Sequence, residues 1–523
     1  MRQFCTFLLL LGFFSSLSAQ NNAPDFWKAV STESITLPAT AERKIQPSVF
    51  NTYQLNYDGI AAALALAPME FTASAKQQPV LLNLPQADGT MRTFRVWESP
   101  VMAPELAAKY PGIRTYAGNA TDGSGTMVRL GTGYKGFYAF MFPPNGDIQS
   151  VRPYADGQNT YYMAYHVKDL PRDAGDAAGI CGTEDQGNAP DYNTPANKGV
   201  IDRGNAQLQI RKYRAAISAQ GEYSLFHGGT KPLVMNAIVE AINFIVAIQE
   251  RDFAVRLELI PNNDTLIYLD PATDPFSGPL VTNWMQQNPA ATNPLVGVNN
   301  YDIGHVFCRV ANQTGLYVAG QASLGGVCSS LFKARAGSSL PSPTGESFYM
   351  IVVHEMGHQF SDDHTFSNCP PSDDQTAPQN AYEPGSGSTI MSYAGTCTPY
   401  DVQNKSDGYF HIASIVQERN FITQGNGSTC GTLVDIDNTI PEASISIPNN
   451  LVIPIRTPFQ LTGSAVDPDA DALTYCWEEY DLGPQSPLGD PQGNAPAFRS
   501  FPPTTSPRNR HTGTQCRAVE IWF

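Results

Sequence analysis

Three histidines and one glutamate in a short stretch of the chain have the residue types and spacing of a catalytic zinc site. His354 and Glu355 begin an HExxH motif that ends at His358, and His364 follows six residues later. Only eight histidines occur among the 523 residues, so three within eleven residues stand out. Zinc binds imidazole nitrogens at about 2.0–2.1 Å, and a catalytic zinc has three protein ligands and an open fourth position. The histidines supply the three ligands.

A helix followed by a turn is needed to position these side chains. Residues 346–353, just before the motif, contain no proline and are typical of a helix. Residues four apart lie one turn apart on the same face of a helix, so His354 and His358 point toward one centre. Glu355 lies about 100° further round, where it can act on a water without being a ligand. His364 completes the set if the helix ends soon after His358 and the chain turns back.

A second feature supports catalysis over a structural metal site or a chance HExxH motif. A structural zinc site normally has a fourth Cys or His and does not need the glutamate. Residues 388–393, in a Gly- and Ser-rich loop, resemble the Met-turn below the zinc of metzincin peptidases. Met391 is therefore expected to pack beneath the metal without binding it, because a thioether is a poor zinc ligand. Tyr393 either stabilises the transition state or packs within the loop.

Alternating strand and helix signals around the motif predict an α/β domain with a mixed sheet and the active-site helix packed across it. We place this domain at residues 206–432. The predicted strands are 207–218, 254–260, 265–269 and 300–307, and the predicted helices besides the motif helix are 232–249, 278–287 and 409–422.

Other patterns flank this domain. Residues 20–180 contain short alternating runs broken by Gly, Pro and Asn, which predict an antiparallel β-rich domain. Residues 181–205 are rich in Gly, Asn, Asp and Pro and indicate an exposed linker. Residues 440–506 alternate with period two, which predicts an immunoglobulin-like β-sandwich with too few strands to be complete. Residues 507–523 have no predicted fold, and we expect a truncated or frame-shifted C-terminus.

Three aspartates in the predicted sandwich have the spacing that opens an EF-hand calcium loop. Asp467, Asp469 and Asp471 match the first ligand positions, but Ala472 stands where glycine is required. Strand-like residues also follow where a helix should begin, which excludes an EF-hand. A Ca²⁺ site between strands and a solvated acidic turn remain as alternatives.

The zinc motif, the Met-turn and the preceding strand–helix order resemble a metzincin of the reprolysin or adamalysin type. More narrowly, residues 301–307, 354–366 and 388–397 resemble secreted bacterial reprolysin-like zinc metalloproteases, and the β-rich region resembles their propeptide. The resemblance implies a zinc endopeptidase made as a latent precursor. It also implies that Glu355 is the general base for a zinc-activated water.

Two residues bear on how such a precursor would work. Ser361 stands where the family usually has a glycine with positive φ, and a non-glycine residue there costs about 1–2 kcal/mol. We expect metal binding to tolerate this, with some effect on geometry and rate. Cys181, flanked by Ile180 and Gly182, resembles the cysteine switch of zymogen metzincins, in which a thiolate occupies the water position on zinc. An ordinary disulfide is the alternative reading of Cys181.

Cysteine usage and the N-terminus indicate an exported protein. Arg2, an apolar run over residues 4–14 and a small-residue cleavage site ending at Ala19 predict a signal peptide over residues 1–19. Export favours disulfide bonds, and Cys476 is either a buried free thiol or a partner of Cys430. Four further cysteines lie on either side of the zinc motif and indicate that disulfide bonds cross-link the loops around it: Cys308, Cys328, Cys369 and Cys397.

Composition narrows the class of partner. Hydrophobic residues make up 42% and charged residues 15%, which is a foldable, loop-rich composition of several domains. The net charge of −16 argues against nucleic acid, and no later segment is long and apolar enough to span a membrane. The expected partners are protein or peptide substrates and an activating protease. A secreted adhesive protein with an impaired metzincin domain is the alternative, although an intact Glu355 favours the enzyme.

Overall fold

The computed structural model describes most of the chain. The described residues are 23–171, 179–185, 207–311, 317–370, 372, 375, 381–445, 461–480 and 482–507. The predicted signal peptide, most of the predicted linker and the tail from residue 508 lie outside them.

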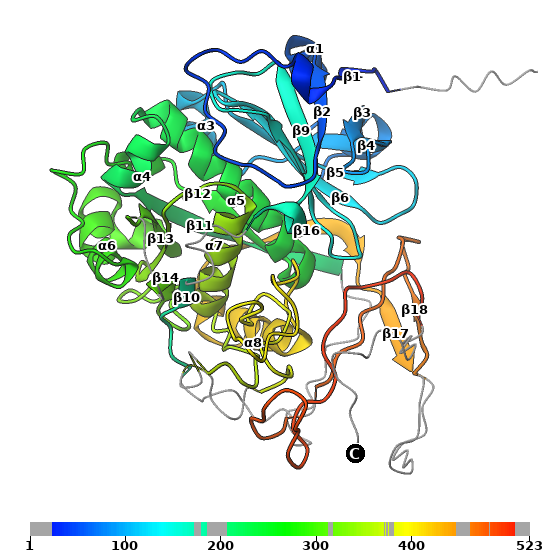
Figure 1. Ribbon diagram of the computed structural model, residues 1–523, viewed down its shortest axis with the longest axis vertical. Helices are drawn as coiled ribbons and strands as arrows, with labels where there is room; N and C mark the ends of the chain where they lie inside the picture. The colour runs from blue at the N-terminus through cyan, green and yellow to red at the C-terminus, as the bar shows by residue number, and fades with distance from the viewer. Residues whose placement is uncertain are drawn as a thin grey trace, which may run out of the picture.

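The N-terminal part, residues 23–171, is a β-rich domain that we call the N-terminal lobe (Figure 1). Its nine strands form one antiparallel sheet in the order β1-β2-β9-β8-β7-β6-β5-β4-β3, which curls toward a barrel. The strands are β1 (Trp27–Ala29), β2 (Asn51–Leu55), β3 (Val80–Pro85), β4 (Met91–Glu98), β5 (Arg114–Ala120), β6 (Met127–Gly133), β7 (Gly136–Phe142), β8 (Gln149–Pro153) and β9 (Tyr161–His166). The helices are α1 (Tyr57–Leu64), α2 (Ala73–Gln77) and α3 (Pro104–Lys109), with 3₁₀ turns η1 (Thr32–Ser34) and η2 (Val167–Asp169). The predicted antiparallel β-rich region is confirmed.

Strand β7 joins this lobe to the next domain because both of its faces are buried. Every residue of the strand is buried, although alternate side chains of a strand point to opposite faces. Phe137 and Met141 lie in the core of the lobe itself. Tyr138, Phe140 and Phe142 lie in the largest hydrophobic core, which belongs mainly to the following domain. The two domains therefore share a continuous core.

The second domain has a mixed sheet of seven strands, as predicted. The order is β10-β14-β15-β13-β11-β12, and β16 pairs with the long strand β11. The strands are β10 (Gly179–Cys181), β11 (Gln207–Ala219), β12 (Val255–Leu259), β13 (Ile303–Arg309), β14 (Tyr317–Ala322), β15 (Ala336–Leu340) and β16 (Thr432–Thr439). The helices are α4 (Gly221–Phe226), α5 (Lys231–Phe253), α6 (Val281–Val296), α7 (Gly345–Gln359) and α8 (Ile412–Thr423), with 3₁₀ turns η4 (Asn263–Leu266), η5 (Val298–Asn300) and η8 (Asn426–Thr429).

Helix α5 is buried on nearly all sides because it lies between the sheet of its own domain and the N-terminal lobe (Figure 1). Contrary to the expectation that no later segment is long and apolar enough to span a membrane, α5 is the one helix among the described residues with that length and composition, but 89% of its most apolar window is buried in the protein. An apolar surface on every side is what such a position between two domains requires.

Two sequence predictions fail in the fold. In the predicted strand over 265–269, Thr265 and Leu266 belong instead to the 3₁₀ turn η4, and only a single parallel β-bridge, from Ile267 to Ala219, is formed. The Asn263 side chain in this turn bonds both the N–H and the carbonyl of Ile217. This tertiary contact outweighs the β-propensity of the segment. The predicted immunoglobulin-like sandwich over 440–506 also finds no support. The described part of that region forms one two-stranded sheet, of β17 (Glu442–Ile445) and β18 (Gly463–Val466), and the residues of β17 are all exposed.

The rest of that C-terminal region lies against the second domain. Glu478 accepts a hydrogen bond from the backbone N–H of Ile412, at the start of α8. Ser388 donates to the carbonyl of Ser500 at 3.3 Å. The aspartate cluster is an exposed turn, because the carboxylate of Asp467 accepts the backbone N–H groups of Asp469 and Asp471. That turn geometry fits the acidic-turn alternative and gives no support to a Ca²⁺ site.

Candidate metal centre

Helix α7 and the turn after it hold the three predicted ligands. His354 and His358 lie one turn apart on the last half of α7, which ends at Gln359. The chain then reverses at Ser361, whose φ of +83° is in the left-handed region predicted for this position. The N–H of Asp362 bonds the carbonyl of Gly357 at 2.9 Å, which closes the turn. His364 is thereby carried back toward the helix.

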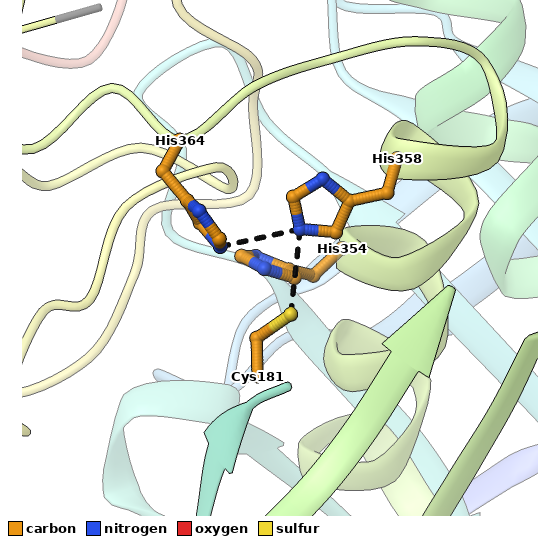
Figure 2. Close-up of side chains that lie close together, drawn as sticks. All are labelled: Cys181, His354, His358 and His364. Carbon is orange, nitrogen blue, oxygen red and sulfur yellow. Dashed lines mark hydrogen bonds between the residues drawn. The ribbon is translucent and has the colours of Figure 1, made fainter. Parts of the chain in front are cut away.

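The three imidazoles meet at one point together with the thiol of Cys181, as Figure 2 shows. One potential ligand atom from each of the four residues lies within 4.8 Å of the others, and all four residues are buried. Nε2 of His358 lies 3.2 Å from Nε2 of His364 and 3.4 Å from Sγ of Cys181. The spacing-based prediction of a three-histidine cluster is therefore confirmed, with a cysteine as its fourth member.

The hydrogen bonds of the rings show that this cluster suits a cation. Each Nδ1–H donates to a backbone carbonyl: His354 to Ile390 at 2.7 Å, His358 to Asp362 at 2.7 Å, and His364 to Gln375 at 3.0 Å. The unprotonated Nε2 atoms are thus left facing one another, and Nε2 of His354 is buried without a hydrogen-bond partner. Converging nitrogen lone pairs with backbone-fixed tautomers are the arrangement expected of zinc ligands.

Burial keeps His354 and His358 in the neutral form that binds metal. It lowers the pKa of His354 to about 3, with a further contribution from His364, and lowers the pKa of His358 well below its ordinary value. Burial also raises the pKa of the Cys181 thiol well above its ordinary value. A bound zinc ion stabilises a thiolate, so a metal would reverse the protonation that burial alone favours at this sulfur.

Glu355 is placed as a base beside the cluster rather than within it. Its carboxylate is 1% exposed and lies 3.6 Å from Sγ of Cys181. Burial raises the pKa of Glu355 to about 8. Room for the carboxylate comes from Gly320 on strand β14, where a Cβ atom would lie 2.3 Å from Oε1 of Glu355. A side chain at position 320 would displace the base.

Met391 and Tyr393 lie below and beside the histidines. The sulfur of Met391 packs on α7, because a Cβ atom on Gly357 would lie 2.6 Å from it, and Met391 is fully buried. The ring of Tyr393 lies 4.9 Å from that of His364, and its hydroxyl donates to Oε1 of Gln375 at 2.7 Å. The same hydroxyl lies 3.4 Å from the carbonyl oxygen of Cys181.

The segment that carries Cys181 enters the site as an added strand. Strand β10 pairs in parallel with the edge strand β14, and Gly182 continues the pairing by donating to the carbonyl of Gly320 at 2.8 Å. Thr183 anchors the segment by exchanging hydrogen bonds with Ala322. Asp185 accepts the backbone N–H of His364 at 3.1 Å and lies 3.0 Å from its Nδ1.

The described cysteines form either disulfide bonds or free thiols. Cys369–Cys397 links the loop after His364 to the segment after the Met-turn, and Cys328–Cys430 ties the turn before β15 to the end of η8. Four cysteines on either side of the zinc motif were predicted to cross-link the loops around it, and three of them do form disulfides: Cys328, Cys369 and Cys397. Cys308 is a buried free thiol. Cys476 is a free thiol, as one of its two readings held, but it is exposed and not buried, and Cys430 pairs with Cys328 instead.

Sequence reasoning did not find some residues of the site. Asp185 and Gln375 contact His364, and Gly320 makes room for Glu355, yet none belongs to a recognisable motif. Asp362 and Asp363, in the turn after α7, are both buried. It is the backbone carbonyl of Asp362, and not its carboxylate, that orients a ligand.

A helix bearing an HExxH pair, a third histidine after a tight turn and a buried methionine nearby are consistent with the zinc site of a metallopeptidase. Comparison with known families agrees: residues 210–421 match the family described as metallo-peptidase family M12B, reprolysin-like. The chain therefore contains a reprolysin-like M12B metallopeptidase domain, which implies a metalloendopeptidase. No curated protein matches the chain.

Proposed function

We propose that the protein is a secreted zinc endopeptidase that is made as a latent precursor. The observation that carries this proposal is the convergence of three Nε2 atoms next to the buried carboxylate of Glu355. His354, His358 and His364 would hold the zinc ion. Bound zinc supplies a Lewis acid for the scissile carbonyl and lowers the pKa of a bound water toward neutrality.

Glu355 is the group that moves the proton in this proposal. A carboxylate with a pKa raised toward neutral pH can accept a proton from the attacking water and return it to the leaving amine. The backbone carbonyls of Ile390, Asp362 and Gln375 hold the rings and keep each Nε2 free of a proton. Met391 supports the helix from below. Tyr393 stabilises the transition state or only packs against His364, and a Phe substitution that lowers kcat would favour the first role.

Latency is proposed to come from Cys181. Its sulfur reaches the histidine cluster, as Figure 2 shows, and it also lies next to the carboxylate of Glu355, so a thiolate there would exclude the catalytic water. The segment that holds it also fills the edge of β14, where an extended peptide substrate would add a strand. The cleft that remains is lined by Ile180, Met350, Ile390 and Thr396, among others.

The rest of the proposal concerns processing. Residues 1–19 would be removed as a signal peptide on export, and residues 20–180 would act as the propeptide, with an activating protease cutting the linker at 181–205. An adhesive protein with an inert domain is the competing function. We favour the enzyme because the base and all three ligands are in place, and because the turn at Ser361 still brings His364 to the centre.

The test combines metal content with cleavage of an unstructured protein. We expect purified protein to contain one zinc per chain, and the form cut in the linker and freed of residues 179–185 to digest casein until a chelator is added. Glu355→Gln should keep the zinc and lose activity by about 10²–10⁴-fold. Absence of stoichiometric zinc, or full activity in Glu355→Gln, would refute the proposed mechanism.

A further inference from the structure

We propose that the N-terminal lobe stays bound to the peptidase domain after the linker is cut, and that it thereby keeps Cys181 at the metal centre. A single cut within residues 186–206 would then leave the protein latent. A second event that frees residues 179–185 from the lobe would be needed for activity. This inference rests on the latency proposed for Cys181 and concerns how that latency ends.

The lobe completes one edge of the peptidase sheet. Strand β12 is the last strand in the sheet order, so its outer edge would otherwise present unpaired backbone groups. Residues 101–103 of the lobe cover this edge. The N–H of Leu259 donates to the carbonyl of Val101 at 2.8 Å, and the N–H of Ala103 donates to the carbonyl of Leu259 at 2.9 Å.

Aromatic side chains of the lobe form part of the peptidase core. The ring of Phe140 lies 5.2 Å from Phe244 on α5 and 6.0 Å from Tyr349 on α7, and Phe142 lies 5.4 Å from Phe244. All four residues are nearly or fully buried. Removal of the lobe would expose this cluster to water, which a lasting interface avoids.

Some polar groups on the facing side of α5 contact the lobe. The amide of Asn243, which is fully buried, donates to the carbonyl of Leu130 at 3.1 Å. Arg152 of the lobe lies 2.5 Å from Glu240 on α5 and 3.3 Å from Glu346 on α7, the active-site helix. The side chains of these three charged residues are at most 8% exposed. Separation of the two domains would leave these buried charges without their partners, which is costly.

A second buried ion-pair group joins the two domains at the far end of α5. Glu250 on α5 bonds Arg129 of the lobe and Arg256 of β12. Arg256 in turn donates to Glu70 of the lobe at 3.0 Å. The lobe therefore contacts β12, α5 and α7 through separate sets of bonds, and no single one of them carries the association.

The inhibitory segment, by contrast, is short and depends on its connection to the lobe. Residues 179–185 are held by pairing with β14 and by the contacts of Thr183 and Asp185. Only residues 172–178 separate this segment from the lobe in sequence. Because this connection is covalent, the segment rebinds within one molecule and does not diffuse away. A cut after residue 186 leaves this tether intact.

The experiment places a recognition sequence for a site-specific protease in the full-length chain, either within residues 188–200 or within residues 172–178, or in both. After cutting within 188–200 alone, we expect the two fragments to co-elute in size-exclusion chromatography. Casein cleavage should stay about tenfold or more below that of the doubly cut protein. The doubly cut protein should be active while the lobe still co-elutes. Separation of the fragments after the single cut would overturn the inference, as would full activity of a co-eluting singly cut complex.

A Cys181→Ala variant with the same single cut distinguishes this inference from the proposed function. We expect it to be active with its lobe still bound, which shows that the thiol, and not the lobe, blocks the site. If this variant is as inactive as the unsubstituted protein after the single cut, while zinc content is normal, the cysteine-based latency fails and the inference fails with it. Co-elution is still scored separately in that case, because it does not depend on Cys181.

Discussion

The sulfur of Cys181 lies 3.4 Å from Nε2 of His358 and 3.6 Å from the carboxylate of Glu355. One side chain therefore contacts a metal ligand and the proposed base together. The two residues it meets belong to helix α7, whereas Cys181 comes from a separate strand far earlier in the chain. Under the proposed latency, a thiolate in this position would obstruct both the metal site and the base.

Replacement of this thiol should activate the uncut protein. We expect Cys181→Ala to raise casein cleavage by about tenfold or more over the unsubstituted precursor, because the tethered sulfur no longer competes for the water position. Cys476→Ser is the matched control, since Cys476 is also a free cysteine but is exposed outside the site. Equal latency of the Cys181→Ala and Cys476→Ser proteins would show that another part of the segment blocks the cleft.

Asp185 should act as a positioning residue for the latent state. Its carboxylate is 1% exposed and holds the backbone and ring of His364, so its loss should loosen the inhibitory segment. We measure the reaction of Cys181 with a thiol reagent in a Cys476→Ser background, and we expect Asp185→Asn to make it several-fold faster. Groups that hydrogen-bond a metal ligand typically contribute about 10–100-fold to metal affinity or activity. Activity of the doubly cut protein should not change, because residues 179–185 have then left. A fall in that activity would point to a general folding defect instead.

The ligands could be predicted from sequence because their geometry is local. The positions of His354 and His358 follow from helix periodicity, and the turn that returns His364 follows from the short interval after the helix. Even the unusual Ser361 was predicted to need a positive φ, and it has one. The three backbone carbonyls that fix the rings have no side-chain signal, so sequence alone could not indicate them.

Long-range pairing limits what residue spacing can predict, and only the family resemblance pointed to Cys181. The approach of Cys181 to the histidines depends on β10 pairing with β14, and those strands are more than a hundred residues apart. The predicted sandwich over 440–506 rested on period-two alternation, which an extended segment lying against another domain also shows. Here residues such as Glu478 and Ser500 contact the peptidase domain, so the alternation did not reflect a separate core.

A glycine at position 361 should stabilise the protein. Ser361 has a φ of +83°, where a non-glycine residue costs about 1–2 kcal/mol, while glycine loses about 0.4–1 kcal/mol more chain entropy on folding. We therefore expect Ser361→Gly to raise Tm by about 1–4 °C in an inactive Glu355→Gln background, which prevents self-digestion. Ser361→Ala keeps the Cβ atom and should give no gain. A gain in Ser361→Ala equal to that in Ser361→Gly would mean that the hydroxyl, and not the backbone, is the source of strain.

His305 should make the fold sensitive to mild acid. It is fully buried on β13, where its ring nitrogens lie 3.1 Å from Oε1 of Gln359 and 3.0 Å from Oγ of Ser338. Burial lowers the pKa of His305 from 6.5 to about 4. Between these two values the unfolded chain binds a proton that the folded protein does not, so the free energy of unfolding falls as pH decreases through this window.

Because of this one residue, the free energy of unfolding should be about 2 kcal/mol lower at pH 5 than at pH 7.5, since each pKa unit corresponds to about 1.36 kcal/mol. That corresponds to a fall in Tm of about 4–8 °C. His305→Gln cannot titrate, so its Tm should fall by that much less between the two pH values. His227, whose pKa burial also lowers, is present in both proteins and cancels in the comparison. Equal falls in Tm for the two proteins would show that His305 is not the group that titrates.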